Sequence, residues 1–338
     1  MAITIKFVYI KFMKVLFIYR NPAMGYSIGK VFQPIEIKMR NNCQTDSIYL
    51  PCSNYSITSL WKNIQFVIHK LENEKFDVIH ITGAEFYLLP FLYKYKTVAT
   101  VHDLGFYTNH NKKTLRGIWK YLLWIKSLRY AKYVTFISDF SKQEALKLVH
   151  LSRHSVVYNP ISSEFQPSLK EFNEECPRIL HIGTKPNKNL FNTIEALKDL
   201  PCRLRIIGKL SEAEKEHLQK NHIDYSNAYN LSDQEIIQEY QQCDIVNFPS
   251  LYEGFGMPIL EGQSIGRVVI TSDISPMKDI AKDTAILVNP TDVNSIRNGY
   301  KRAIELHDLY VERGYKNIKR FSVETIANEY KKIYELIS

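Results

Sequence analysis

Short apolar segments rich in β-branched residues alternate along this chain with longer segments of helical spacing. Predicted strands of the first half span residues 15–19, 47–50, 78–82, 98–102 and 134–138, and those of the second half span 179–183, 204–208, 245–249, 268–271 and 285–288. Between them, Ser141, Ser211 and Ser232 each precede a glutamate by three residues, the spacing of a capping box. This alternation predicts an α/β fold of parallel sheets connected by helices.

A polar, proline-containing stretch near the middle of the chain divides this pattern in two. We expect a first domain over residues 1–160, a linker over 161–176, a second domain over 177–320 and an amphipathic C-terminal helix over 321–338. The first twelve residues are apolar but lack a small-residue cleavage site, so we do not expect a signal peptide. Met13, directly before the first regular strand, is the candidate natural start.

Composition and charge narrow the class of protein. The 338 residues are 45% apolar and 23% charged, as in globular proteins, and no stretch approaches the roughly 20 apolar residues of a membrane span. Five scattered cysteines without metal-ligand spacing indicate reduced thiols in a cytoplasmic protein. Residues 1–160 hold 22 Lys and Arg against 9 Asp and Glu, whereas residues 161–338 hold 22 against 26. The basic first half indicates an anionic partner, such as a membrane surface or a phosphate-bearing acceptor.

The most informative segment places two carboxylates, Glu253 and Glu261, around a glycine turn that opens a helix. Gly254 and Gly256 allow a tight backbone path, and Pro258 suits the first helical turn. The start of this helix would bind an anion such as a diphosphate. Glu261 can accept hydrogen bonds from a vicinal diol such as ribose, and Glu253 can reach the group that the phosphate carries. The pattern predicts a nucleotide-sugar site, with an ordinary strand–turn–helix junction as the alternative.

The same residues carry a family resemblance. Glu253 and Glu261, with Gly254, Phe255, Gly256, Met257, Pro258, Ile259 and Leu260 between them, resemble the E-x7-E motif of retaining GT-B glycosyltransferases of the group 1, family 4 type. The resemblance implies two Rossmann-like domains facing across a cleft, with a C-terminal helix that crosses back to the first domain. It also implies transfer from a nucleoside-diphosphate sugar, with UDP or GDP as carrier, to a saccharide or lipid-linked acceptor. No metal and no cofactor are expected.

A second segment resembles the family's phosphate-binding loop. A glycine and lysines at a helix start, Gly183, Lys185 and Lys188, form a candidate anion cradle in which Lys188 neutralises the diphosphate. Thr184 stands where the family usually has arginine, and Lys185 is the candidate for the missing charge. A solvated lysine pair in a loop is the alternative. Further along, Asn230 and Leu231 match the place where the family holds the base, mainly through backbone groups.

Two candidates fall in the first half. Gly25, Ser27 and Gly29 follow the first strand and predict a flexible loop; the resemblance places such a loop near the diphosphate and acceptor, and a plain strand–helix connection is the alternative. His102 ends the fourth predicted strand, where Asp103 or the backbone would fix its tautomer. The resemblance implies that His102 contacts the donor sugar and takes part in catalysis with Glu253 and Lys188. A structural histidine at a strand end is the alternative.

A basic segment follows this strand, with seven Lys and Arg and no acidic residue between Leu104 and Ser138. On a helical wheel, one arc holds the residues Lys112, Lys113, Arg116, Lys120, Leu123 and, at its border, Trp124; the opposite, core-facing stripe holds Leu115, Ile118, Leu122 and Ile125. A basic face with inserted apolar groups is typical of helices on anionic lipid. A merely solvated face is the alternative.

Several other chemistries lack their motifs. The chain contains no zinc spacing, P-loop, G-x-S-x-G, G-x-G-x-x-G or Asp-x-Asp pattern, so we predict no metal site and no nucleic-acid partner. The expected function is sugar transfer in bacterial surface polysaccharide synthesis, in the cytoplasm and in part at the inner face of the cell membrane. A nucleotide-sugar epimerase of the same fold and a non-catalytic nucleotide-sugar-binding subunit are the alternatives.

Overall fold

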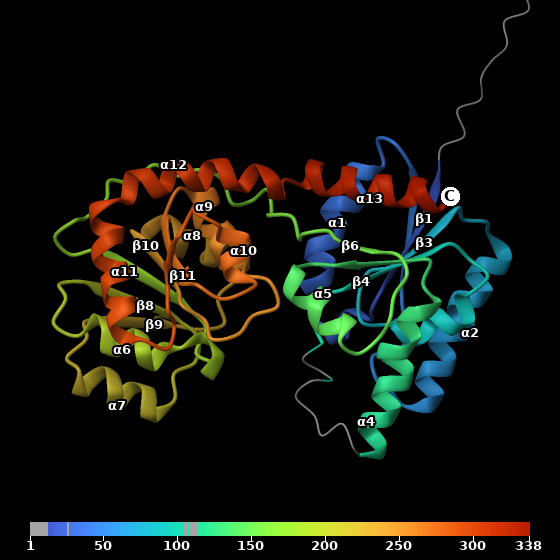
Figure 1. Cartoon of the computed structure of the whole chain (residues 1–338), viewed down its shortest axis with the longest axis horizontal. Helices are drawn as coiled ribbons and strands as arrows, with labels where there is room; N and C mark the ends of the chain where they lie inside the picture. Colours follow the sequence, from blue (N-terminus) through green and yellow to red (C-terminus); the bar gives the residue numbers. More distant parts are fainter. Residues whose placement is uncertain (1–12, 26, 105–106, 108–113) are drawn as a thin grey trace, which may run out of the picture. The chain divides into compact units, whose positions relative to one another are not determined.

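The computed structural model describes residues 13–25, 27–104, 107 and 114–338. The chain divides into two compact units (Figure 1). Unit 1 comprises residues up to 136, 142–157 and 327–338, and unit 2 comprises 137–141 and 158–326. Each unit is built on a six-stranded parallel sheet, so the predicted α/β class is confirmed.

The sheet of unit 1 has the strand order β2-β1-β3-β4-β5-β6, and all neighbouring strands run parallel. Its strands are β1 (Lys14–Tyr19), β2 (Gln44–Tyr49), β3 (Val78–Ile81), β4 (Thr97–Val101), β5 (Tyr133–Phe136) and β6 (His154–Val156). The three central strands β1, β3 and β4 are buried nearly throughout. Apolar side chains therefore point to both faces, as expected for a parallel sheet covered by helices on each side.

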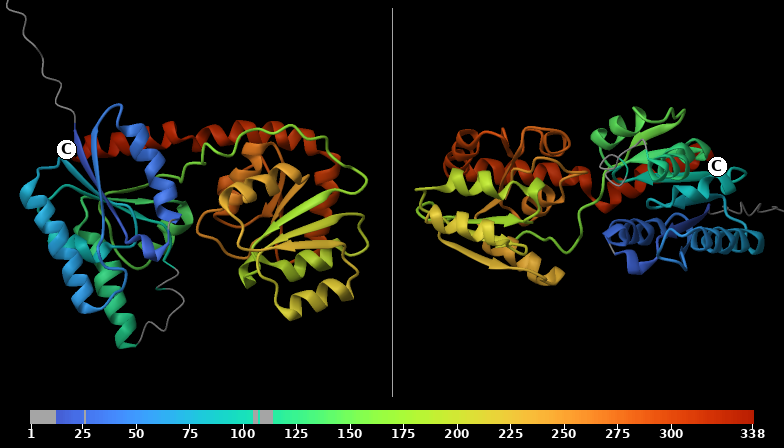
Figure 2. Two further views of the ribbon diagram at one scale, coloured as in Figure 1. Left: turned by 180° about the vertical axis from the view of Figure 1, so that it is seen from behind. Right: turned by 90° about the horizontal axis from the view of Figure 1, so that it is seen from below.

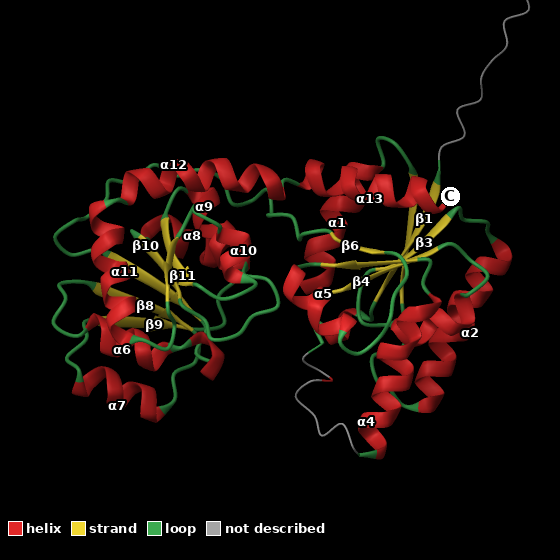
Figure 3. Cartoon of the chain, in the orientation of Figure 1, coloured by secondary structure: helices red, strands yellow, loops and turns green. Residues whose placement is uncertain are grey.

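Helices and short 3-10 or π turns connect these strands (Figure 3). They are η1 (Pro22–Met24), α1 (Ser27–Met39), α2 (Ile57–Asn73), η2 (Phe86–Leu92), α4 (Leu115–Lys120), η3 (Tyr121–Ile125), η4 (Lys126–Tyr130) and α5 (Asp139–Leu146). The stretch from α4 to η4 is unusual, because an α-helical turn passes directly into a π-helical segment and then into a 3-10 turn. Helical periodicity changes along this stretch.

The sheet of unit 2 has the order β12-β11-β10-β7-β8-β9 and is also fully parallel. Its strands are β7 (Arg178–Ile182), β8 (Arg203–Ile207), β9 (Tyr225–Ala228), β10 (Ile245–Phe248), β11 (Val268–Ser272) and β12 (Ile286–Val288). Successive strand residues point to opposite faces. Ile245 and Val268 belong to one hydrophobic cluster, and their neighbours Val246 and Val269 belong to another.

Helices lie on both faces of this second sheet (Figure 2). The helical elements that follow β7 along the chain are η5 (Pro186–Lys188), α6 (Leu190–Leu197), α7 (Glu212–Lys220), α8 (Asp233–Gln242), α9 (Met257–Ile265), α10 (Met277–Ala281), α11 (Val293–Glu305), α12 (His307–Ile318), η6 (Lys319–Phe321) and α13 (Val323–Ile337), most of which is part of unit 1. The cluster on one face includes side chains of α6, α7 and α11, and the other includes side chains of α8, α9 and α10. This double cover places the strand ends, where ligands of such sheets bind, at the surface.

All ten predicted strands are present, and the sequence analysis missed β6 and β9. Both missed strands lie at a sheet edge and are partly exposed, so neither has the buried apolar run that identifies a central strand. The predicted capping boxes at Ser211 and Ser232 are confirmed. The one at Ser141 is wrong, because α5 begins at Asp139 and the Ser138 hydroxyl accepts from the Ser141 N–H at 3.1 Å.

Residues 327–338 of α13 complete the core of unit 1 (Figure 1, red). Tyr334 Oη lies 2.5 Å from Nδ1 of the fully buried His80, and Tyr330 Oη lies 3.2 Å from the Thr100 hydroxyl. The other ring nitrogen of His80 lies 2.8 Å from the same Thr100 hydroxyl. Burial lowers the pKa of His80 to about 3, so its ring is neutral in this cluster. The C-terminal helix thus closes a hydrogen-bonded core across β3 and β4.

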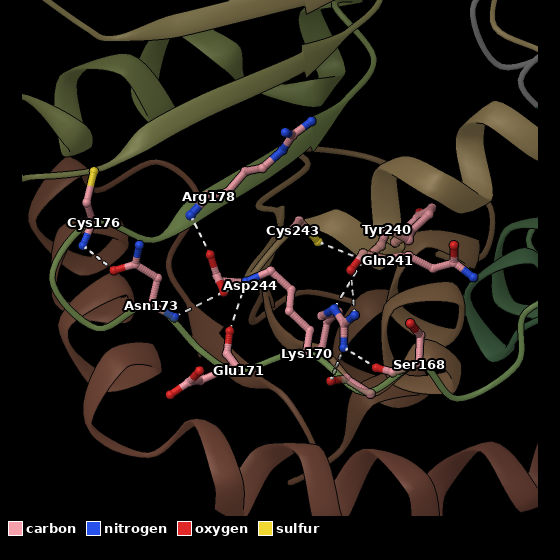
Figure 4. Close-up of polar contacts among 12 residues, drawn as sticks. Ser168, Lys170, Glu171, Asn173, Cys176, Arg178, Tyr240, Gln241, Cys243 and Asp244 are labelled. Carbon is pink, nitrogen blue, oxygen red and sulfur yellow. Dashed lines mark hydrogen bonds and ion pairs between the residues drawn. The ribbon is translucent and has the colours of Figure 1, made fainter.

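The segment predicted as a linker is attached to unit 2 by hydrogen bonds (Figure 4). Asp244, whose side chain is 3% exposed, accepts from the backbone N–H groups of Arg178 at 2.7 Å and Asn173 at 3.2 Å and forms an ion pair with Lys170. Arg267, also buried, donates to the Ser168 carbonyl at 2.9 Å. These contacts hold the segment before β7 against the end of α8.

Candidate active site

The glycine turn predicted to bind the donor joins β10 to α9 in unit 2. Gly256 is the N-cap residue of α9 and has a φ of 125°, a conformation that favours glycine. A Cβ atom there would lie 3.1 Å from Ile259 Cδ1. Pro258 lies in the first turn, as predicted. Gly256 has no side chain to cap this nine-residue helix, Pro258 has no N–H, and the Ile259 N–H donates to the Gly256 carbonyl at 3.0 Å. The attraction for an anionic ligand at this end would therefore come mainly from the helix dipole.

Glu261 lies one turn into α9 and is oriented by a neighbouring helix. The hydroxyl of Tyr240 on α8 donates to Glu261 Oε2 at 2.5 Å. Burial, with the Glu261 charge, raises the pKa of Tyr240 well above its ordinary value, so this hydroxyl stays protonated. Glu261 itself is only partly buried. The sequence analysis missed Tyr240, because a buried aromatic residue on a helix gives no signal of the carboxylate that it contacts.

Glu253 is held by the loop that follows β7. Lys188 Nζ lies 2.6 Å from Glu253 Oε1, and both side chains are mostly buried, with 20% and 16% exposure. Asn187 Nδ2 donates to the same oxygen at 3.3 Å and to the Tyr252 carbonyl at 2.9 Å. The ammonium group also lies 4.9 Å from the centre of the Phe248 ring. The structure therefore brings together Lys188 and Glu253, two predicted site residues that lie 65 positions apart in the sequence. It adds Asn187, which was not predicted.

Gly183 makes room for the Lys188 side chain. Its φ is 96°, and a Cβ atom there would lie 2.8 Å from Lys188 Cγ. Thr184, at the position where arginine was expected, donates its hydroxyl to the Lys209 carbonyl at 2.8 Å. Thr184 thus has a structural hydrogen bond, and Lys185 is exposed at the start of η5. Lys188 is accordingly the cation that the structure places beside Glu253.

Several of the residues predicted to bind the donor have side chains that are buried or partly buried. Phe255, Ile259 and Leu260 are buried in the hydrophobic core of unit 2, whereas Gly254, Met257 and Pro258 are partly buried at the turn. Asn230 is exposed with a φ of 58°, and Leu231 packs partly against the same core. Both precede the capping box of α8, next to the edge strand β9.

His102 lies in unit 1, directly after β4. Its Nε2–H donates to the Thr82 carbonyl at 2.9 Å, so the backbone rather than Asp103 is the partner that fixes its tautomer, with Nδ1 left as an acceptor. Burial lowers the pKa of His102, which favours the neutral ring. The residue therefore presents a hydrogen-bond acceptor at the carboxyl edge of the first sheet.

The predicted flexible loop at residues 25–29 is largely helical, so this expectation is wrong. Gly25 ends η1 with a φ of 102°, and α1 begins at Ser27 and includes Gly29. The Gly25 carbonyl accepts from Arg20 Nε at 3.1 Å. The prediction of a loop rested in part on Gly29, which in fact lies in the first turn of α1. The three residues still lie at the end of β1, where ligands of parallel sheets bind.

Comparison with known proteins was made on the whole chain. Residues 162–320 match the family described as glycosyl transferases group 1, and residues 32–165 match the glycosyltransferase family 4 description. The chain belongs to the group 1 glycosyltransferases. The expected enzyme class is thereby confirmed.

This glycosyltransferase has similar relatives and solved structures. It is 26% identical over 292 residues to the O-antigen chain mannosyltransferase B of Escherichia coli, across 75% of this chain and 74% of that protein. Its fold is similar to sucrose-phosphate synthase from Thermosynechococcus elongatus (TM-score 0.75, 15% identity, 96% and 99% coverage). It is also similar to the lipopolysaccharide outer core galactosyltransferase WaaB (TM-score 0.72, 18% identity, 96% and 100% coverage). The expected GT-B fold is confirmed.

The basic segment of the glycosyltransferase differs from its prediction. Lys112 and Lys113 lie outside the described residues. Three residues of the predicted core-facing stripe, Leu115, Ile118 and Leu122, are 80%, 47% and 43% exposed, whereas Trp124 of the predicted basic arc is buried. The helical wheel assumed 3.6 residues per turn, and the π-helical segment η3 changes that phase. Ile125 alone of the stripe is fully buried.

Two structural features bear on membrane and metal binding in the described part of the glycosyltransferase. None of its helices has the length and apolar character to cross a membrane. Within the same residues, His, Cys, Asp and Glu side chains form no group of three that would hold a metal ion.

Glu85 makes the free energy of unfolding of the glycosyltransferase depend on pH in a testable way. Its side chain is 2% exposed, no described residue hydrogen-bonds to either carboxyl oxygen, and burial raises its pKa to about 7. Because ionisation is disfavoured in the folded state, Glu85 lowers stability as pH rises from its unfolded pKa of 4.5 through 7. We expect Glu85→Gln to be close to neutral at pH 5 and to raise the free energy of unfolding by up to about 3 kcal/mol at pH 8.

Urea unfolding at the two pH values measures this difference. Glu72→Gln, at an exposed carboxylate on α2, is the matched control and should give the same stability change at both pH values. An equal effect of Glu85→Gln at pH 5 and pH 8 would contradict the prediction.

Proposed function

We propose that this glycosyltransferase is a retaining, metal-independent enzyme that moves a sugar from a nucleoside-diphosphate donor to a saccharide or lipid-linked acceptor. The observation that best supports this is the contact of Lys188 with Glu253 at 2.6 Å, just before a glycine-capped helix that carries Glu261. The Escherichia coli relative is named as an O-antigen chain mannosyltransferase. We therefore place the reaction in bacterial surface polysaccharide synthesis, in the cytoplasm or at the inner face of the cell membrane.

The arrangement suits departure of a diphosphate. As the bond between sugar and phosphate breaks, negative charge develops on the phosphate oxygens. Lys188 and the positive N-terminal end of the α9 dipole would stabilise this charge, because both are already fixed by the fold. Gly183 supports this role, since it leaves space for the aliphatic part of Lys188.

The two carboxylates would hold the remaining parts of the donor. Lys188 and Asn187 both contact Oε1 of Glu253, so we assign Oε2 to a sugar hydroxyl and to the support of oxocarbenium character. Glu261, fixed by Tyr240, would accept from the ribose hydroxyls. His102, with its neutral Nδ1, would orient the donor sugar.

A phosphate oxygen of the donor is the base that we assign to the acceptor hydroxyl. The proton passes to that oxygen while the acceptor oxygen bonds to the anomeric carbon, on the face from which the phosphate leaves. This assignment follows because Glu253 and Glu261 are committed to the donor. It predicts a product with the anomeric configuration of the donor, which NMR of the isolated product measures, and inversion would overturn it.

The donor class is tested by thermal stabilisation with UDP, GDP and ADP in the presence of EDTA. A nucleotide at 100 times its Kd should add about 2.7 kcal/mol of stability. GDP-mannose and UDP-hexoses are the sugars to test next, because the relative is named a mannosyltransferase. Failure of all three nucleotides to stabilise the protein would overturn the donor assignment.

Glu261→Ala is expected to weaken binding of the stabilising nucleotide by about 10- to 100-fold, since a hydrogen bond to a charged group contributes roughly 1.5–3 kcal/mol. Isothermal titration with the nucleotide and with the free base separates the ribose contribution, because binding of the base should not change. Glu216→Ala on α7, at an exposed carboxylate, is the control. Unchanged nucleotide affinity in Glu261→Ala would overturn the ribose assignment.

A further inference from the structure

Unit 1 contains a large cavity that shares only His102 with the proposed donor-binding residues. It has a volume of about 1060 Å³ and is bounded by α2, η2 and the stretch formed by α4 and η3. This volume is at the upper end of the range of about 300–1,000 Å³ for small-molecule sites. A concave space of this size is suited to a bound small molecule or chain rather than to a flat protein interface.

The walls of the cavity are mainly apolar and aromatic. All three tryptophans of the chain, Trp61, Trp119 and Trp124, line it. Trp124 is buried and contacts Tyr55 and Tyr87, with ring centres 5.1 and 5.7 Å apart. This aromatic floor offers few hydrogen-bond partners over most of its area. Such a surface is complementary to an apolar chain.

The rim of the cavity keeps large apolar side chains in water. Trp119 is 58% exposed, Trp61 52% and Phe91 43%, and Trp61 lies 6.4 Å from Phe91 between ring centres. Ile57, which also lines the cavity, is 81% exposed. An apolar chain that enters between these residues would remove them from water. Each CH₂ group buried in this way contributes about 0.8 kcal/mol of favourable free energy.

Charged and polar groups are few and come from defined positions. Arg20 follows β1, and His102 and Asp103 follow β4, so all three lie at the carboxyl edge of the sheet, and Lys120 ends α4. The Arg20 guanidinium is oriented by its bond to the Gly25 carbonyl. Two cations and one carboxylate leave a net positive charge beside the apolar space, which complements an anionic headgroup attached to a hydrocarbon chain. The first half of the chain, with its excess of Lys and Arg, has the same preference.

We propose that this cavity binds the hydrocarbon chain of a lipid-linked saccharide acceptor, with the phosphate that joins lipid and saccharide at Arg20 and Lys120. The inference rests on the proposed function and narrows it from a saccharide or lipid-linked acceptor to the lipid-linked class. An acceptor is favoured over a bilayer lipid because His102, the candidate sugar-contacting residue, is part of the same cavity wall. A chain anchored here holds its headgroup at the edge of the sheet where transfer is expected.

Intrinsic tryptophan fluorescence tests the proposal directly, because every tryptophan lines the cavity. The protein is titrated with farnesyl phosphate below its micellar concentration, and in parallel with farnesol and inorganic phosphate. We expect a saturable change with farnesyl phosphate, a weaker affinity for farnesol and no change with inorganic phosphate. A response to inorganic phosphate equal to that with farnesyl phosphate, or no response to farnesyl phosphate, would overturn the proposal.

Matched variants locate the binding. Phe91→Ala should raise the Kd for farnesyl phosphate about tenfold, whereas Tyr93→Ala, at a 54% exposed aromatic residue two positions away that does not line the cavity, should leave it unchanged. Lys120→Ala should weaken the binding of farnesyl phosphate but not that of farnesol. Lys126→Ala, at an exposed lysine, is its control. Equal effects of Phe91→Ala and Tyr93→Ala would place the ligand elsewhere and overturn the proposal.

Two further measurements separate this inference from its alternatives. Nucleotide stabilisation of the same preparations reports on unit 2, so a normal nucleotide response without a farnesyl phosphate response overturns the cavity proposal alone. Vesicles of phosphatidylglycerol test the bilayer source. A fluorescence change that occurs with vesicles and never with monomeric farnesyl phosphate would identify membrane docking and reject an acceptor chain.

Discussion

Lys188→Ala is expected to lower kcat/KM by about 10²–10³-fold, the usual effect of removing one group that stabilises charge in a transition state. The ammonium lies 2.6 Å from Glu253 and 4.9 Å from the Phe248 ring centre, so its position is fixed before the donor arrives. The substitution also leaves Glu253, with 16% side-chain exposure, without its cation. Steady-state kinetics with the donor sugar identified by nucleotide stabilisation measures the effect, which should fall mainly on kcat.

Lys220→Ala, which removes one exposed lysine at the end of α7, controls for net charge and should retain full activity. Lys185→Ala reports whether the exposed lysine beside Thr184 adds a second positive charge to the phosphate site. Gly183→Ala should mimic Lys188→Ala in part, since the added Cβ would lie 2.8 Å from Lys188 Cγ. Full activity of Lys188→Ala would remove this residue from the phosphate site.

Asp244→Ala is expected to lower the free energy of unfolding of unit 2 by about 3–5 kcal/mol, as when one partner of a buried ion pair is removed. Its carboxylate accepts from two backbone N–H groups and pairs with Lys170, so three donors lose their acceptor at once (Figure 4). Urea denaturation followed by circular dichroism measures the change, with nucleotide stabilisation as a probe of unit 2. A thermal shift of roughly 2–4 °C per kcal/mol should accompany it.

Asp224→Ala provides the matched control, because Asp224 pairs with Arg203 at 3.6 Å while both side chains are more than 70% exposed. Such surface pairs typically contribute less than about 1 kcal/mol. Asp244→Asn retains an acceptor oxygen for the backbone N–H groups. Its free energy of unfolding should lie between those of Asp244→Ala and Asp224→Ala. Equal unfolding free energies for Asp244→Ala and Asp224→Ala would show that the segment before β7 does not depend on this carboxylate.

The fold was largely predictable because its central strands are buried on both faces. Segments such as Val15–Tyr19 and Ile245–Phe248 consist of apolar and β-branched residues, a pattern that a parallel sheet requires. The edge strands β6 and β9 have one poorly covered side and a mixed sequence, so periodicity did not reveal them. The stretch after Leu115 was misread because its helical phase changes at a π-helical segment, which no residue pattern announced.

The candidate site shows a similar division. Glu253, Glu261 and Lys188 were predictable because glycine turns and helix starts mark them in the sequence, and their roles stay predictions. Tyr240 and Asn187 could not be found in this way, since each contributes one hydrogen bond across a contact between distant segments. The aromatic cavity was equally invisible, because its tryptophans lie on separate elements and only folding gathers them.

The position of Tyr330 and Tyr334 has a consequence for how the protein is made. These residues follow the second unit in the sequence, yet they complete the core that contains His80 and Thr100 in the unit built from the first half of the chain. During synthesis the core of that first unit stays incomplete, with His80 Nδ1 lacking its Tyr334 partner, until the second unit has emerged. Domains usually fold in the order of their synthesis. Here the second unit can fold first, and loss of residues 327–338 would remove core contacts of unit 1 while leaving unit 2 intact.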